Sequence, residues 1–273
     1  MKPYGREGRG EGWVLSGPDC RATARLMISA ARASAVLFLV KSCAGAIDSS
    51  ERQRFHELTQ WVAEIGGVAN GALVIGETSG GLRGLFLDKA VAKDEALVGI
   101  PLDYVIGHDS QDNKCKMIKA FEKEVRLGDS SRLHPYIKMD DSLNSPIPGL
   151  WSDEAIRMLQ DLTPKNPAVH FRWYLRNCLG RELPSLFAYA KAFSELPIEE
   201  RRAVLAFVTR IFNIGFLPVV DLANHDNSNT NTYMARDETG NMMLMKASRD
   251  LEPGEQVIRS YGHTSTPQIF YCE

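Results

Sequence analysis

The sequence predicts an α+β fold in which a block of helices interrupts a strand-rich domain. Short apolar runs separated by Gly-rich or charged turns occupy residues 72–101, and runs of the same kind return after Phe216. Between them, apolar residues recur at helical spacing over about residues 112–212. A repeating βαβ unit would alternate strands with helices along the whole chain, so this grouping favours a strand-rich fold with a helical insertion.

The composition is that of a globular chain. Its 273 residues allow one large domain or a domain with an appendage, and 44% hydrophobic and 24% charged residues exclude a coiled coil or a disordered tail. The 32 Lys and Arg residues nearly balance 34 Asp and Glu residues, for a net charge of −2. No global field would therefore hold nucleic acid or an anionic membrane. We expect no nucleic-acid partner, and we also expect the chain to be monomeric.

The cysteines do not predict a disulfide framework or a zinc site. Five is an odd number, and none of the five shows C-x-x-C spacing. We expect free thiols that behave as small buried or inert groups, with no bound metal. The five are Cys20, Cys43, Cys115, Cys178 and Cys272.

Residues 1–50 are predicted to be a leader outside the fold. A start rich in Gly and charges precedes the apolar run 35–40, which leads to Ala44-Gly45-Ala46. A basic flank, a short apolar stretch and an A-x-A-like site are typical of a signal peptide, so residues 1–46 indicate secretory or plastid targeting. The alternative is a disordered extension behind a start codon placed too early, in a cytoplasmic or nuclear protein. The apolar run is far shorter than the roughly 20 residues of a membrane span.

Regular elements are expected over residues 51–273. Apolar residues from Phe55 to Ile65 recur at helical spacing, and Gly66-Gly67 ends that helix. Ser152 is expected to cap one helix of the insertion, and Pro197 to lie in the first turn of another. The predicted strands are residues 72–75, 84–87, 96–100, 217–220, 241–246 and 256–258, with a turn at 237–240. The predicted inserted helices are residues 112–127, 152–162, 168–178, 184–194 and 198–212.

Several common catalytic motifs are missing. The sequence contains no G-x-G-x-x-G after a strand, no G-x-x-x-x-G-K-[ST], no H-E-x-x-H and no G-x-S-x-G. Rossmann cofactors, P-loop nucleotides, zinc proteases and α/β-hydrolase chemistry therefore lack their usual support.

Polar residues gather where two predicted strands end. Asp221, Asn224 and His225 follow one strand, Tyr261 follows the last strand, and Arg210 lies near the end of the preceding helix. An Arg for a carboxylate, an Asp for an ammonium and an Asn for either can hold a zwitterionic, amino-acid-like ligand. Asn and Asp after a strand are also ordinary turn formers, so the residues alone leave both interpretations open.

Five segments resemble SET-domain methyltransferases, in the branch typified by the plastid Rubisco large-subunit lysine methyltransferase. Residues 221–225 match D-x-x-N-H, and residues 252–262 resemble the G-E-x-[VL]-x-x-x-Y-G segment that ends in the catalytic tyrosine. Residues 82–101 are similar to the first strands of the domain, with Leu82 and Asp94 where the pattern has Gly. The inserted helical region is matched by His134-Pro135-Tyr136 and Leu150-Trp151-Ser152, and [ST]-R-x-F is matched by Thr209-Arg210-Ile211-Phe212.

The resemblance implies a SET-domain fold that transfers a methyl group from S-adenosylmethionine to a lysine of a protein substrate. Arg210 would pair with the cofactor's carboxylate, and Asn224 and His225 would hold its adenosine and methionyl parts. Asp221 would help to shape the same pocket. Gly84 would let the backbone approach the cofactor. The implied cofactor-binding set is Arg83, Gly84, Glu124, Arg210, Asp221, Asn224 and His225.

Tyr261 is implied to be the catalytic residue, with its hydroxyl placed to orient the substrate amine. Tyr233 would line the lysine channel, although strand tyrosines are also common on exposed faces. No metal is required, because the protein mainly has to position the nucleophile for an in-line displacement.

Two alternatives and one departure accompany the resemblance. The alternatives are a non-catalytic SET module that binds a protein segment, and a protein-histidine methyltransferase. After the catalytic tyrosine, Thr266 stands where the family has Asn, and the chain ends about where an aromatic-Gly-Phe stretch would close the channel. The family's helical C-terminal domain would follow. We therefore expect this form to be a poor methyltransferase and a longer transcript to exist.

Overall fold

The computed structural model describes residues 47–110, 113–141, 143, 154, 169–226 and 228–261. The chain divides into two compact units, Met1–Ala44 and Gly45–Glu273, and all the described residues belong to the second. Its first helix begins at Ser49, before the predicted start of the domain, and the Asp48 side chain caps it by accepting a hydrogen bond from the Glu51 N–H at 2.7 Å. The predicted targeting segment 1–46 and the chain end after Tyr261 lie outside the described residues.

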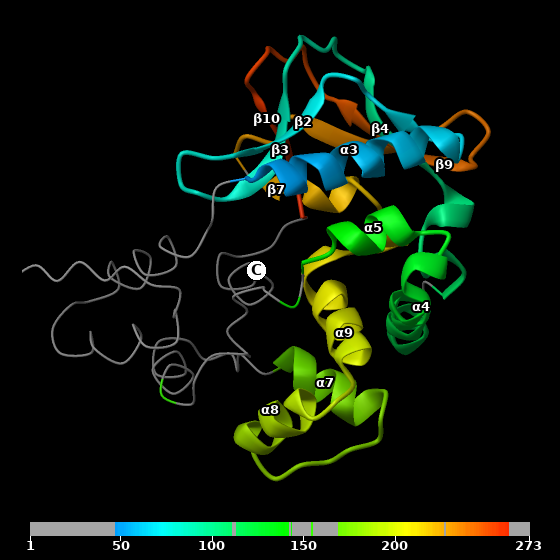
Figure 1. The fold of residues 1–273 in the computed structure, drawn as a ribbon, viewed down its shortest axis with the longest axis vertical. Helices are drawn as coiled ribbons and strands as arrows, with labels where there is room; N and C mark the ends of the chain where they lie inside the picture. The colour runs from blue at the N-terminus through cyan, green and yellow to red at the C-terminus, as the bar shows by residue number, and fades with distance from the viewer. Residues whose placement is uncertain are drawn as a thin grey trace, which may run out of the picture. The chain divides into compact units, whose positions relative to one another are not determined.

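The described strands form two four-stranded sheets and one short pair (Figure 1). The strand orders are β1-β4-β9-β8 and β2-β3-β10-β7, and β5 pairs with β6. Within the two larger sheets, β10 and β7 are parallel and the other pairs are antiparallel. The strands are β1 Val68–Ala69, β2 Leu73–Glu77, β3 Arg83–Leu87, β4 Ala96–Pro101, β5 Ile211–Phe212, β6 Gly215–Phe216, β7 Asn224–His225, β8 Thr232–Arg236, β9 Met242–Ala247 and β10 Gln256–Arg259.

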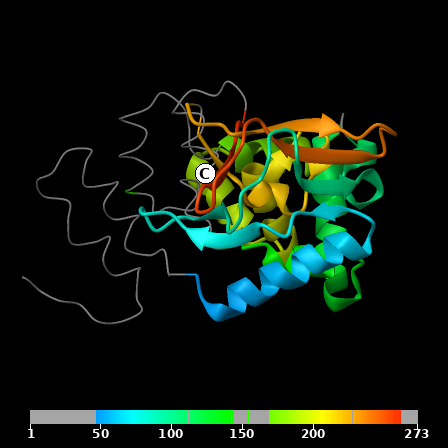
Figure 2. The same cartoon turned by 90° about the horizontal axis from the view of Figure 1, so that it is seen from above.

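The helices confirm the predicted arrangement, because most of them fall between β4 and β5 in the chain. They group together below the sheets in the view of Figure 1, whereas α3 lies along the sheets, as the turned view in Figure 2 shows. No helix in the described ranges is long and apolar enough to cross a membrane. The helices are α3 Ser49–Glu64, α4 Lys114–Leu127, α5 His134–Met139, α7 Val169–Asn177, α8 Leu186–Ser194 and α9 Ile198–Arg210.

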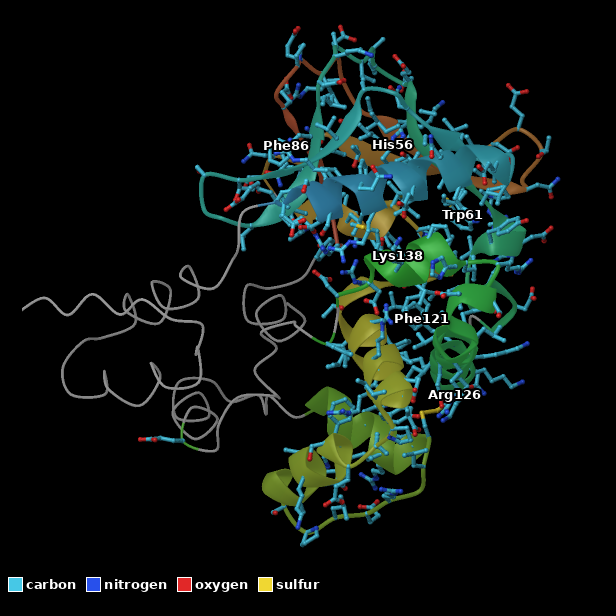
Figure 3. The ribbon with its side chains drawn as sticks, in the orientation of Figure 1. His56, Trp61, Phe86, Phe121, Arg126 and Lys138 are labelled. Carbon is cyan, nitrogen blue, oxygen red and sulfur yellow. A yellow bond between two sulfur atoms is a disulfide. The ribbon has the colours of Figure 1, made fainter. Side chains whose placement is uncertain are left out.

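The core joins the inserted helices to the segment that precedes β7. Phe121 of α4 lies 4.5 Å from the Phe216 ring and 6.1 Å from the Tyr136 ring, centroid to centroid. All three side chains are buried. On the other side of α5, Lys138 pairs with Glu57 of α3 at 2.8 Å; Phe121 and Lys138 are labelled in Figure 3. The fold thereby holds Tyr136 of α5 against both the core and the segment before β7.

The strand predicted at residues 217–220 is wrong. Pro218 has no N–H for a strand ladder, and Val219 adopts a left-handed φ of +67°. A short 3-10 helix, Val220–Leu222, takes the place of the strand and is followed by β7. Only residue 154 of the predicted helix at 152–162 is described, and the predicted Ser152 cap lies outside the described ranges. Apolar patterning also does not predict β8, because most of its side chains are exposed.

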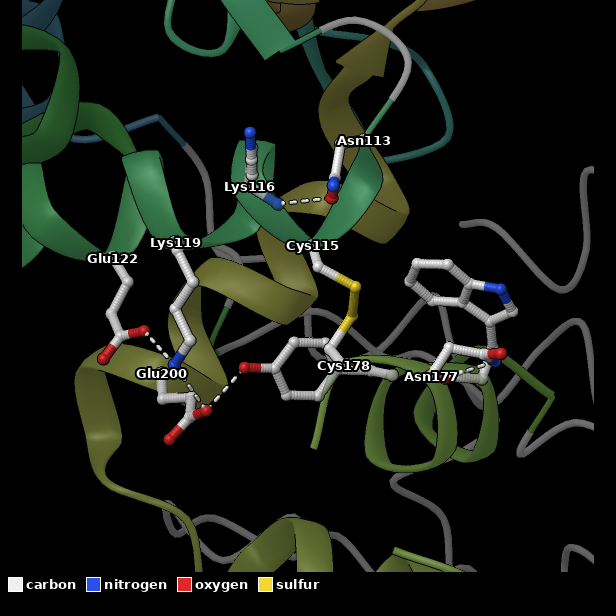
Figure 4. Close-up of a disulfide and its surroundings, with 10 residues drawn as sticks. Asn113, Cys115, Lys116, Lys119, Glu122, Asn177, Cys178 and Glu200 are labelled. Carbon is white, nitrogen blue, oxygen red and sulfur yellow. Dashed lines mark hydrogen bonds and ion pairs between the residues drawn. A yellow bond between two sulfur atoms is a disulfide. The ribbon is translucent and has the colours of Figure 1, made fainter. Parts of the chain in front are cut away.

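Cys115 and Cys178 form a disulfide, so the expectation of free thiols is wrong for these two (Figure 4). They lie 63 residues apart, in α4 and just after α7, and spacing along the chain does not show that they meet. Beside the bond, Lys119 Nζ lies 2.7 Å from Glu122 and 2.9 Å from Glu200 of α9. Burial opposes the charge of Lys119, but these two carboxylates outweigh it and raise its pKa. The disulfide and the ion pairs together connect α4, α7 and α9.

Loss of the disulfide is expected to destabilise the domain. In the chain-entropy description, closing a loop of this length contributes about 4 kcal/mol. Cys115→Ser with Cys178→Ser should therefore lower the urea midpoint at constant pH, measured by circular dichroism. Reductant should lower the midpoint of the parent protein and leave that of the double variant unchanged. A parent midpoint that stays constant while free thiols appear would show that the bond contributes nothing to stability.

Candidate functional site

A buried arginine at the end of α9 contacts three aspartates. The Arg210 guanidinium lies 3.5 Å from Asp221 Oδ2 and 3.4 Å from Asp140 Oδ1, and its Nη2 contacts Asp141 Oδ1. Burial alone would lower the pKa of Arg210, but the three carboxylates outweigh it and raise the pKa, so the guanidinium stays charged. The charge gathers acidic side chains from two segments far apart in the sequence.

Asp221 connects this cluster to the core. The Tyr136 hydroxyl donates a hydrogen bond to Asp221 Oδ2 at 2.7 Å, and both side chains are buried. Asp221 Oδ1 is also buried and has no hydrogen-bond partner in the part of the chain that the structure describes. Burial raises the pKa of the Asp221 carboxyl, against the attraction of Arg210. A buried oxygen of this kind is suited to accept a hydrogen bond from a ligand.

Arg83 begins β3 and joins the ion cluster to the sheet. Its guanidinium lies 2.7 Å from Asp141 Oδ2 and 3.0 Å from Glu51 Oε1. Its backbone carbonyl accepts a hydrogen bond from Asn224 Nδ2 at 2.8 Å. Asp141 therefore bridges Arg83 and Arg210, and Arg83 in turn holds the side chain of Asn224.

Gly84 lies where the chain has no room for a side chain. A Cβ atom there would lie 2.6 Å from Gln256 Nε2 and 2.8 Å from Asn224 Nδ2. Both distances are shorter than van der Waals contact. The absence of a side chain thus allows Asn224 to reach the backbone of β3.

His225 and Tyr261 lie together beside the parallel strands β7 and β10. His225 pairs in register with Arg259, and its Nδ1 accepts a hydrogen bond from the Tyr261 N–H at 2.9 Å. The same Nδ1 lies 3.2 Å from the Arg259 carbonyl oxygen, and Nε2 is buried with no hydrogen-bond partner among the described residues. The two rings stack with centroids 4.6 Å apart, and the Tyr261 hydroxyl donates to the Ala223 carbonyl at 3.3 Å.

Arg259 is a site residue that the sequence analysis misses. The central carbon of its buried guanidinium lies 3.9 Å from the Tyr261 ring centroid and 4.1 Å from that of Phe212. A cation over an aromatic face is attracted by the ring quadrupole. Arg259 ends β10 and Tyr261 lies two residues beyond it, so the strand pattern alone does not show that the two side chains meet. Asp140 and Asp141 are also missed, since they follow α5 in a segment without periodicity.

Two predicted site residues, Glu124 and Tyr233, form hydrogen bonds to residues outside the ion cluster. Glu124 accepts a hydrogen bond from Ser131 Oγ at 2.6 Å and lines a pocket of about 450 Å³ that none of the other predicted site residues lines. Tyr233 is 39% exposed, and its hydroxyl donates to Asp94 Oδ1 at 2.8 Å. The structure therefore gathers the other six predicted residues and Tyr261 without bringing Glu124 or Tyr233 to the ion cluster. Apart from these two, the grouped residues are Arg83, Gly84, Arg210, Asp221, Asn224, His225 and Tyr261.

The family model for the SET domain matches residues 82–262, which is most of the chain. The chain belongs to the SET-domain family. Its matched region includes the first and last strands of the site and the whole inserted block. No curated protein matches the sequence.

Solved structures support this SET fold at low sequence identity. One is the SET domain of LSMT bound to lysine and AdoHcy, with a TM-score of 0.57 and 16% identity over 80% of this chain. Another is the same domain bound to methyllysine and AdoHcy, with a TM-score of 0.59 and 17% identity over 80% of this chain. Rubisco LSMT bound to sinefungin and monomethyllysine has a TM-score of 0.58 and 19% identity over 82% of this chain. This SET chain covers 56% of each of these structures.

Gly84→Ala tests the close approach of β3 to Asn224. The added methyl group would overlap the ends of the Gln256 and Asn224 side chains, so we expect Asn224 to move off the Arg83 carbonyl and stability to fall by about 1 kcal/mol, the typical net contribution of one hydrogen bond. Thermal and urea unfolding measure the change. Gly71→Ala is the matched control, because a Cβ atom at Gly71 meets nothing within 4 Å. Equal midpoints for the two variants would contradict the packing described above.

Proposed function

We propose that this SET domain is an S-adenosylmethionine-dependent protein-lysine N-methyltransferase. The observation that carries the proposal is the convergence of Asn224, His225 and Tyr261 at the β7–β10 strands, beside the arginines of the ion cluster. LSMT structures of the same fold are described as bound to lysine or methyllysine together with AdoHcy.

The residues present fit a cofactor that carries an amino-acid group. Arg210 and Arg83 supply cations for its carboxylate. Asp221 Oδ1 and His225 Nε2 are buried polar atoms without hydrogen-bond partners among the described residues. Gly84 keeps the backbone of β3 open to close approach. When bound, S-adenosylmethionine supplies a methyl group on a sulfonium, which is electrophilic without a metal.

Tyr261 is the proposed catalytic residue. Its ring stacks on His225, and Arg259 lies over the same ring, so its position is set by two neighbours. A hydroxyl held in this way can orient a substrate amine. Orientation of the nucleophile is the main contribution of the protein to an in-line displacement. The substrate is a protein with an accessible lysine side chain. The monomeric state and targeting by residues 1–46 stay predictions.

Cofactor binding can be measured directly by calorimetry on the full chain. We expect S-adenosylhomocysteine to bind, and Arg210→Lys to weaken binding about tenfold, because lysine keeps the charge and loses the planar fork. Arg210→Ala is less informative, since it leaves three carboxylates without their buried cation. The control is Arg249→Lys, an exposed arginine paired with Glu255. A folded parent protein that gives no heat of binding would refute the proposed function.

A second experiment distinguishes a role of Tyr261 in catalysis from a role in cofactor binding. Tyr261→Phe should keep the affinity for S-adenosylhomocysteine and lower methyl transfer about 100-fold, since only the transition state loses the hydroxyl. Transfer of labelled methyl groups to proteins of a cell extract, followed by mass spectrometry of the digest, gives both the rate and the modified residue type. Tyr233→Phe is the control, with transfer expected near the parent rate.

The same digest distinguishes the alternatives. Methylhistidine in place of methyllysine would support a histidine methyltransferase. Cofactor binding without transfer to any protein would support a non-catalytic module. An equal loss of transfer in both tyrosine variants would return Tyr233 to the substrate channel.

A further inference from the structure

The three aspartates around Arg210 differ in their access to solvent. The Asp140 and Asp221 side chains are 0% exposed, whereas that of Asp141 is 47% exposed. The Arg210 side chain itself is 7% exposed. Asp141 therefore lies between solvent and the buried guanidinium.

The hydrogen-bond and ion-pair partners of the three aspartates also distinguish the two buried ones from Asp141. Asp221 accepts a hydrogen bond from the Tyr136 hydroxyl in the core, and Asp140 accepts one from Arg202 Nε at 2.6 Å. Asp141 spans the two arginines. Its Oδ1 contacts Arg210 and lies 3.2 Å from Arg83 Nη2, and its Oδ2 lies 2.7 Å from Arg83 Nη1. Moving either buried aspartate would leave an uncompensated charge in the interior, whereas Asp141 can rotate its carboxylate toward water.

We propose that Asp141 occupies the arginines in competition with the carboxylate of the cofactor, and thereby sets the cofactor affinity of the domain. The inference rests on the proposed function, because it takes Arg210 and Arg83 as the carboxylate partners. Asp141 presents to them the same chemical group, a carboxylate, from within the chain. A ligand carboxylate reaches Arg210 as Asp141 leaves it.

The charges in the cluster favour replacement of Asp141 by the ligand carboxylate over binding of that carboxylate beside Asp141. The cluster contains three arginines and four carboxylates when Arg202 and Glu51 are included. A further carboxylate beside an unmoved Asp141 would add like charge in a partly buried site, which is unfavourable. Departure of Asp141 keeps the charge of the cluster constant, because the ligand carboxylate takes its place beside Arg210 and Arg83.

Asp141→Asn is the decisive variant, because the amide keeps the shape of the side chain and loses the charge. We expect the dissociation constant for S-adenosylhomocysteine to fall five- to tenfold, measured by calorimetry on the full chain. We expect no change for 5′-methylthioadenosine, which has the nucleoside and lacks the amino-acid group. Glu57→Gln is the control, since Glu57 is a part-exposed carboxylate that pairs with Lys138 of α5, outside the ion cluster. It should change either affinity by less than twofold.

The outcomes are distinct. Unchanged or weaker binding of S-adenosylhomocysteine to Asp141→Asn overturns the inference, and weaker binding would make Asp141 a direct partner of the ligand ammonium. An equal gain for both ligands also overturns it, because the gain would then not depend on a carboxylate. Absence of binding by folded parent and variant alike refutes the proposed function itself. Asp141→Ser provides a second reading if the asparagine variant does not fold.

Discussion

The buried positive charge of Arg210 constrains the arrangement of the whole site. A guanidinium removed from water must be compensated within the fold, and here aspartates from the end of α5 and from the 3-10 turn before β7 do so. These segments are about eighty residues apart, so the ion cluster ties the helical insertion to the sheet that carries Tyr261. Breaking a buried pair from one side typically costs roughly 3–5 kcal/mol, which makes the cluster a structural element as well as a candidate binding site.

The turn before β7 follows from the same constraint. A strand through residues 217–220 would have extended the ladder and carried Asp221 away from the helices. Instead Val219 adopts φ +67° and ψ −47°, a rare γ-turn conformation closed by a hydrogen bond from the Val220 N–H to the Pro218 carbonyl at 2.8 Å, and it does so fully buried. The hydrogen bond from Tyr136 to Asp221 and the contact of Phe121 with Phe216 hold the turn in place.

Sequence patterns predicted what depends on neighbours along the chain. The long helices and the strands β2, β3, β4, β9 and β10 follow from periodicity, and Asn224, His225 and Tyr261 follow from their places at strand ends and from the family resemblance. The features that sequence patterns miss depend on contacts between residues far apart in the chain. Periodicity does not show that Cys115 meets Cys178, or that Asp141 reaches two arginines. Spacing placed Glu124 correctly on a helix and did not reveal that its carboxylate contacts Ser131.

The site has two parts with different physical origins, and Arg83 belongs to both. Backbone pairing of β7 with β10 fixes the part formed by His225 and Tyr261, whereas side-chain charges fix the part formed by Arg210 and Asp141. The Arg83 carbonyl holds Asn224 in the first part, while its guanidinium meets Asp141 in the second. Arg83 is therefore the residue through which the Asp141 ion pair and the Asn224 hydrogen bond are in contact. A change in the pairing of Asp141 would alter the surroundings of the same residue that positions Asn224.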